Sequence, residues 1–159
     1  MLFHSLHEGP GGSALLQLRC TLRGDLQPAA LEGAWQRVVD RHAILRSRMV
    51  PRALRAPMQV VQSYAEMPWT TLDWTGVAAD VQAHRWAQVI EDDRRRGLPA
   101  GVAPLLRVTV AALGAGAHHF LWTSHHLTLD GWSTQVVLRD VLDAYAALRN
   151  GRAWEKPAP

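Results

Sequence analysis

The residues best suited to chemistry are two adjacent histidines, His125 and His126, followed at short spacing by Asp130 and Gly131. An unperturbed imidazole has a pKa of about 6.5, so it can accept a proton near neutral pH. Asp130 could orient a histidine ring, pair with an arginine or fix the loop, while Gly131 leaves space for a substrate beside the backbone. Backbone N–H groups of a helix that starts here could face negative charge developing on an acyl oxygen. The residue types and their spacing therefore favour acid–base chemistry by a histidine.

A predicted strand over residues 120–126 places the two histidines. Side chains alternate between the two faces of a strand. We therefore expect His126 on the face of Phe120, Trp122 and Ser124, and His125 on the opposite face. The two histidines must have different roles, and His126 at the strand end is the one suited to acid–base work.

Other interpretations of the motif compete with this one. An isolated aspartate such as Asp130 is more often a helix N-cap than a catalytic acid, and His125 fits a packed, hydrogen-bonded structural histidine. A metal could be bound by His125, His126 and Asp130. However, adjacent strand residues point apart and no Cys or Glu cluster completes a coordination shell, so we predict no metal. A hydrolytic triad would need a G-x-S-x-G elbow, which the chain lacks.

The elements around the motif follow from periodicity and from Gly and Pro positions. Residues 14–23 alternate apolar and polar side chains and predict a half-buried strand. The predicted helices are 28–42, opened by Pro28, then about 79–96, stopped by Gly97, and about 132–149. Short strands joined by a loop are expected within 44–62, two further strands at 104–112 and 118–125, and no regular element at 66–76. This order predicts an α/β fold (an α+β sandwich), with a mixed, largely antiparallel sheet covered by helices.

Composition narrows the classes of function. The chain has 159 residues, a formal charge of +3 and a sequence pI of about 9.7, yet its 17 basic residues are spread among 14 acidic ones. The densest basic run, residues 94–96, directly follows the acidic run 91–93, as at the solvated end of a helix. We therefore expect no nucleic-acid partner. No apolar run is long enough to span a bilayer, no secretory signal is evident, and Cys20 is the single cysteine, so a cytoplasmic location is predicted.

The run HHLTLDGWS at 125–133 matches an HHxxxDG signature, and further matches occur in order along the chain. They are MLFHSL at 1–6, RHAILRSRM at 41–49, MPWTTLDW at 67–74 and APLLRV at 103–108. Together they make the chain resemble the condensation domains of nonribosomal peptide synthetases. Those domains belong to a superfamily that includes chloramphenicol acetyltransferase-like enzymes.

The resemblance implies an amide-forming acyltransferase that joins a donor acyl or peptidyl thioester to the amine of an acceptor. It implies His126 as the catalytic histidine and Gly131 as backbone beside the reacting carbonyl. His125, Asp130, Arg41 and Arg46 become structural supports, with Asp130 pairing with an arginine. The implied partners are donor and acceptor peptidyl carrier proteins. Their phosphopantetheine arms present the substrates, so no permanently bound cofactor is expected.

The resemblance covers one lobe of a domain that has two. It assigns residues 1–149 to an N-terminal lobe and 150–159 to a linker toward an absent C-terminal lobe, and the chain is expected to be inactive without that lobe. A fragment, one chain of a split domain, and a non-catalytic half-domain for protein contacts all fit. Leu98-Pro99-Ala100 replaces the usual Phe-Asp-Leu, which favours the last of these. A CoA-dependent acyltransferase is the remaining enzyme alternative. The exposed inter-lobe face predicts self-association.

Overall fold

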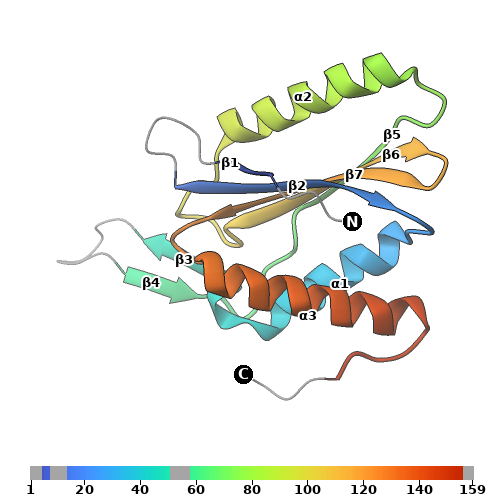
Figure 1. Ribbon diagram of the computed structural model, residues 1–159. Coiled ribbons are helices and arrows are strands. Elements are labelled where there is room, and N and C mark those ends of the chain that lie inside the picture. Colours follow the sequence, from blue (N-terminus) through green and yellow to red (C-terminus); the bar gives the residue numbers. More distant parts are fainter. Residues whose placement is uncertain (1–4, 8–13, 51–57, 156–159) are drawn as a thin grey trace.

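A five-stranded sheet lies between one helix on one face and two helices on the other (Figure 1). The computed structural model describes residues 5–7, 14–50 and 58–155. The strands of this sheet, in spatial order, are β1 (Ser5–His7), β2 (Leu15–Arg23), β7 (Ala117–His125), β6 (Leu106–Gly114) and β5 (Trp69–Asp73). The helices are α1 (Pro28–Arg41), α2 (Ala79–Arg96) and α3 (Gly131–Arg149). In Figure 1, α2 covers one face, and α1 and α3 cover the other.

The pairing of the strands is mixed. β1 with β2, β2 with β7 and β6 with β7 are antiparallel, whereas β5 runs parallel to β6. The predicted sandwich with a mixed, largely antiparallel sheet is thus confirmed. Where short strands were predicted at 44–62, the structure has a 3₁₀ helix (Ala43–Arg46) followed by a separate two-stranded sheet of β3 (Ser47–Val50) and β4 (Met58–Val61). The loop predicted between those two strands lies outside the described residues.

The main core fills the space between the sheet and the helices α1 and α3. One face of α1 is buried. It includes Trp35, at 0% exposure, whose ring centroid lies 4.9 Å from that of Trp122 on β7. Pro28 occupies the first turn of α1, where a missing N–H costs nothing. The helix ends at Arg41, one residue before the predicted end at 42, and His42 is its C-cap. Its ring Nε2 lies 2.9 Å from Asp140 Oδ2 on α3.

The interpretation of residues 66–76 as irregular was wrong, because Trp69–Asp73 forms β5. The alternation in 14–23 also misled, since it placed Gln17 on a solvent face, yet this residue is only 3% exposed. Helix α2 covers that face of β2 at Gln17, whose side-chain amide bonds to Ile90 O and Asp93 of the helix. Asp93, interpreted as part of a solvated helix end, is likewise buried.

The segment after α3 begins by packing against the fold. Trp154 is partly buried against the core, and the Arg41 guanidinium lies 5.8 Å from its ring centroid. The assignment of 150–159 as a linker toward a second lobe stays a prediction. Among the described residues no helix has the length and apolar character needed to cross a bilayer.

Candidate active site

The motif lies in the connection between the last strand of the sheet, β7, and helix α3. β7 ends at His125, and α3 begins at Gly131. The short segment between them is tied back to the strand end: Thr128 N donates to His125 O at 3.0 Å, and Thr128 Oγ1 donates to the same oxygen at 3.1 Å. A central strand and a helix therefore fix both ends of this turn.

His126 lies in the turn itself and is exposed. Its backbone N–H donates to Ala14 O at 2.7 Å, just before β2. The strand predicted over 120–126 was one residue too long at its end. β7 ends at His125, which pairs with Leu15, and His126 follows the strand. The two histidines do differ in their surroundings, but not because they lie on opposite faces of one strand. His125 belongs to the strand, and His126 belongs to the turn.

His125 is partly buried, and its ring has a defined partner. The Leu127 N–H donates to His125 Nδ1 at 3.1 Å. Burial lowers the pKa of His125, and the charge of the neighbouring His126 lowers it further. A ring that accepts a hydrogen bond and resists protonation is suited to holding the turn.

Asp130 is the N-cap of α3. Its Oδ1 accepts from Ser133 N at 2.8 Å, Ser133 Oγ also donates to the carboxylate, and the Asp130 N–H donates to Ser133 Oγ at 3.0 Å. These bonds from the Ser133 hydroxyl and N–H lower the pKa of the Asp130 carboxyl. The structure thus places this residue in a capping box. The arginine pairing that the resemblance implies for it stays a prediction.

Gly131 is the first residue of α3, and a Cβ added there would meet no described atom within 4 Å. The described residues therefore give no steric reason for glycine at this position.

Arg41 and Arg46 contact other parts of the fold. Arg41 Nε lies 3.4 Å from Asp140 Oδ2, which joins the end of α1 to the middle of α3. Arg46 donates to Gln62 O and, at 3.2 Å, to Ser63 O, which ties the 3₁₀ helix to the chain after β4. These contacts are with the scaffold of α1, α3 and β4, while His125, His126, Asp130 and Gly131 lie together at the motif.

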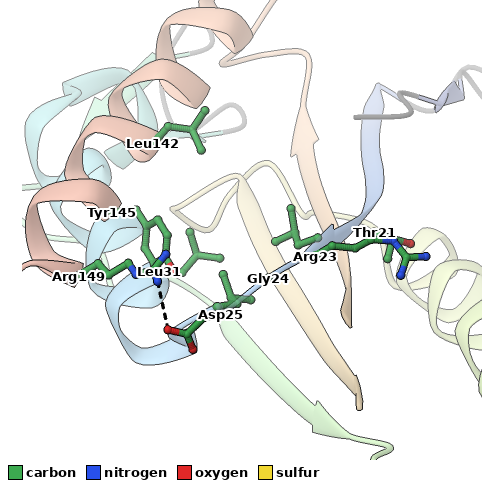
Figure 2. Close-up of a pocket in the computed structure, with 10 residues that line it drawn as sticks. Thr21, Arg23, Gly24, Asp25, Leu31, Leu142, Tyr145 and Arg149 are labelled. Carbon is green, nitrogen blue, oxygen red and sulfur yellow. Dashed lines mark hydrogen bonds and ion pairs between the residues drawn. The ribbon is translucent and has the colours of Figure 1, made fainter. Parts of the chain in front are cut away.

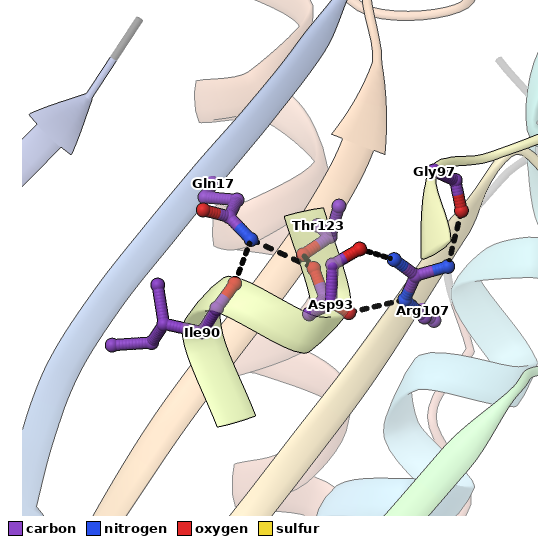
Figure 3. A network of polar contacts seen from close by, with 6 residues as sticks. All are labelled: Gln17, Ile90, Asp93, Gly97, Arg107 and Thr123. Carbon is purple, nitrogen blue, oxygen red and sulfur yellow. Dashed lines mark hydrogen bonds and ion pairs between the residues drawn. The ribbon is translucent and has the colours of Figure 1, made fainter. Parts of the chain in front are cut away.

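Sequence reasoning missed a buried polar network beneath α2 (Figure 3). Asp93 pairs with Arg107 of β6 and accepts from Gln17 Nε2 at 2.7 Å and from Thr123 Oγ1 at 2.5 Å. Arg107 also donates to Gly97 O at 2.6 Å. One carboxylate thus joins the end of α2 to β2, β6 and β7. Thr123 lies two residues before His125 in β7, so this network anchors the strand that ends at the site.

A pocket in the described part of the chain lies elsewhere (Figure 2). It has a volume of about 730 Å³ and is lined by the end of β2, the start of α1 and the later turns of α3. Antiparallel pairing puts Leu15 beside His125 and Arg23 beside Ala117, so the pocket is at the opposite end of these strands from the motif. The described residues contain no cluster of three or more His, Cys, Asp or Glu side chains able to hold a metal ion.

Comparison with known proteins gives consistent matches. A family model described as "Condensation domain" matches residues 1–158. A linear gramicidin synthase protein of Brevibacillus parabrevis is 41% identical over 152 residues, which are 96% of this chain and 2% of that protein. Chondramide synthase cmdD of Chondromyces crocatus is 34% identical over 149 residues, 90% of this chain and 4% of that protein. The chain therefore spans only a few per cent of the length of the curated relatives it matches.

Solved structures share the fold. The first condensation domain of the CDA synthetase has a TM-score of 0.78 and 24% identity, covering 93% of this chain and 37% of that one. The X-domain from teicoplanin biosynthesis has a TM-score of 0.74 and 30% identity, covering 92% of this chain and 30% of that one.

Proposed function

This chain belongs to the condensation-domain family of nonribosomal peptide synthetases, and from that premise we propose that it supplies the histidine side of an amide-forming active site. The substrates are a donor acyl or peptidyl thioester and the amine of a second, carrier-bound thioester. Both arrive on the phosphopantetheine arms of peptidyl carrier proteins. The observation that carries the proposal is His126, exposed in a turn held between β7 and the start of α3.

In the proposed reaction the acceptor amine attacks the donor carbonyl carbon. A C–N bond forms, the C–S bond breaks, and the donor arm leaves as a thiol after taking a proton. His126 accepts the proton that the attacking nitrogen loses and returns it to the leaving sulfur, which is the work of a general base followed by a general acid. The open space beside Gly131 leaves room for the reacting carbonyl near the N-terminus of α3.

We propose that a C-terminal lobe forms the opposite wall of this site. Three apolar side chains around the motif support this: Trp132 is 81% exposed, Leu127 47% and Val136 40%. Large apolar side chains exposed at and just after a candidate site in the sequence fit a surface that a partner covers. Without that partner the chain is expected to self-associate through the same surface, which light scattering at increasing concentration would detect.

The test is peptide transfer between two loaded carrier proteins, with the second lobe supplied in the same chain or in trans. His126→Ala should reduce the transfer rate at least about 10²-fold, the usual lower bound for loss of a general acid–base group. His84→Ala is the matched control, because His84 is an exposed histidine on α2, away from the motif. Equal rates for wild type and His126→Ala would overturn the catalytic assignment. Turnover of soluble acyl-CoA without carrier proteins would instead favour a CoA-dependent acyltransferase.

One observation favours a second candidate function, a non-catalytic domain for protein contacts. The X-domain of teicoplanin biosynthesis is known as a complex with OxyB, and it aligns here with 27% identity and a TM-score of 0.71. On this alternative the chain binds a protein partner, and transfer is absent even with both lobes and both carriers present. The altered segment Leu98-Pro99-Ala100 agrees with it. The same transfer assay decides between the two functions.

A further inference from the structure

We infer that His125 is a positioning residue: its Nδ1 accepts the Leu127 N–H and thereby fixes the turn that carries His126. This inference rests on the proposed function for the role of His126, and it assigns to His125 one atom and one tautomer. The donor here is a backbone N–H, so the direction of the bond is set by chemistry and does not depend on how the ring is protonated.

The turn needs such an acceptor because the chain leaves the sheet at this point. His125 N donates to Leu105 O at 3.0 Å as the last bonded residue of β7, and His126 N donates to Ala14 O at 2.7 Å. The next backbone donor, Leu127 N–H, bonds to the ring of His125, two residues earlier. Short polar side chains of Asn and Asp make the same local bond in Asx-turns. Two hydrogen bonds therefore fix the backbone at His126: its own N–H bonds to Ala14 O, and the bond from Leu127 N–H to the His125 ring joins the residues on either side of it.

The bond also dictates the state of the ring. A neutral imidazole has one acceptor nitrogen and one N–H. Because Nδ1 is the acceptor, the proton of neutral His125 must be on Nε2. Protonation of Nδ1 would place two N–H donors against each other and break the contact with Leu127. Burial and the neighbouring His126 both lower the pKa of His125, in agreement with a ring held neutral.

This arrangement divides the work between the two histidines. His126 is exposed and can exchange a proton with a substrate, while His125 keeps a fixed protonation state as part of the turn. Small displacements of a catalytic group reduce rate steeply, about 10²-fold for 1 Å in sensitive cases. Loss of the Nδ1 bond should therefore act on the rate constant of transfer more than on substrate binding.

Two substitutions separate the Nδ1 role from general packing. In His125→Asn, the side-chain oxygen can occupy the Nδ1 position and accept from Leu127. In His125→Gln, the amide reaches instead toward the Nε2 position and leaves Leu127 without its partner. In the full-length synthetase loaded with both carrier-bound substrates, we expect His125→Asn to keep kcat within about threefold of wild type. For His125→Gln we expect a loss of about tenfold or more, with KM little changed. Equal kcat for the two variants, or a loss in KM alone, would overturn the inference.

A second measurement needs no activity. Nitrogen-15 NMR of the folded wild-type protein should show His125 Nδ1 as the unprotonated, pyridine-type nitrogen, with a scalar coupling to the Leu127 amide proton. A proton on Nδ1 in the neutral ring would overturn the inference even if both variants fold poorly. The spectrum also separates the two proposals. If His126→Ala leaves transfer unchanged, the proposed function fails, whereas the tautomer result for His125 stands or falls by itself.

Discussion

Removing the Asp93 carboxylate should be among the most destabilising single changes in the chain. Asp93 is 9% exposed and Arg107 is 8% exposed, so the ion pair between them is removed from water. Asp93→Ala leaves the guanidinium buried without its counter-charge. It also takes the acceptor away from Gln17 Nε2 and Thr123 Oγ1.

The magnitude follows from these contacts. Breaking a buried ion pair by deleting one partner costs about 3–5 kcal/mol, because the remaining charge is uncompensated. The Thr123 hydroxyl and the Gln17 amide also lose their acceptor, which adds to the cost. These energies are not additive, because all of these contacts are made by the one Asp93 carboxylate. A domain of this size has a free energy of unfolding of about 5–15 kcal/mol. We therefore expect Asp93→Ala to lose about 3 kcal/mol or more, enough to leave the fold marginal.

The assay is urea denaturation followed by circular dichroism, and Asp92→Ala is the matched control. Asp92 is the neighbouring carboxylate on the same helix and also pairs with an arginine, Arg95, but both side chains are more than 60% exposed. An exposed pair of this kind contributes about 0–1 kcal/mol. Asp92→Ala should therefore hardly shift the urea midpoint.

A double replacement sharpens the test. Changing both Asp93 and Arg107 to leucine removes the charge and its counter-charge together, so it should cost less than Asp93→Ala alone. Similar midpoints for Asp93→Ala and Asp92→Ala would refute the reasoning. So would a double variant whose loss equals the sum of the two single losses, since the network would then contribute no coupling.

Four further predictions follow from single positions. Asp130→Ala should lower the urea midpoint by removing the α3 cap, and Asp130→Asn should restore most of it. Gly116→Ala should cost about 1 kcal/mol or more, because φ is +67° and the new Cβ would lie 3.2 Å from Gly24 O; an unchanged midpoint would contradict this. Burial lowers the pKa of His119, and burial together with the charge of His126 lowers the pKa of His125. Around and below the usual histidine pKa of 6.5, the unfolded chain therefore binds more protons than the folded chain. Stability should thus be full above about pH 6.5 and fall as the pH drops through and below it, with a smaller fall in His119→Gln. Burial raises the pKa of the Cys20 thiol, so iodoacetamide should label it more slowly than an unfolded control at pH 8; equal rates would contradict this.

The sequence was sufficient for the elements whose signal is local. The periodicity of side chains and the positions of glycine and proline predicted helix α1, the end of α2 at Gly97 and the pair of strands β6 and β7. Each of these predictions is confirmed. The motif is local too, since four of its residues lie within seven positions of one another and resemblance to a family identified them. The roles assigned to those residues stay predictions for the assays above.

Tertiary structure alone decided what depends on partners distant in sequence. β5 has half-exposed residues and no clear period, and it is a strand because it pairs in parallel with β6, more than thirty residues later. Gln17 and Asp93 are inside because α2 covers a face of the sheet that alternation assigned to water, and burial requires a polar partner for each. His126 N–H still bonds to Ala14 O beside β2, and the chain turns away after it because the next donor, Leu127 N–H, bonds to the His125 ring. Each backbone N–H needs a hydrogen-bond acceptor, and the acceptor depends on which groups the fold brings near it. The spacing of residues in the sequence therefore does not predict these bonds.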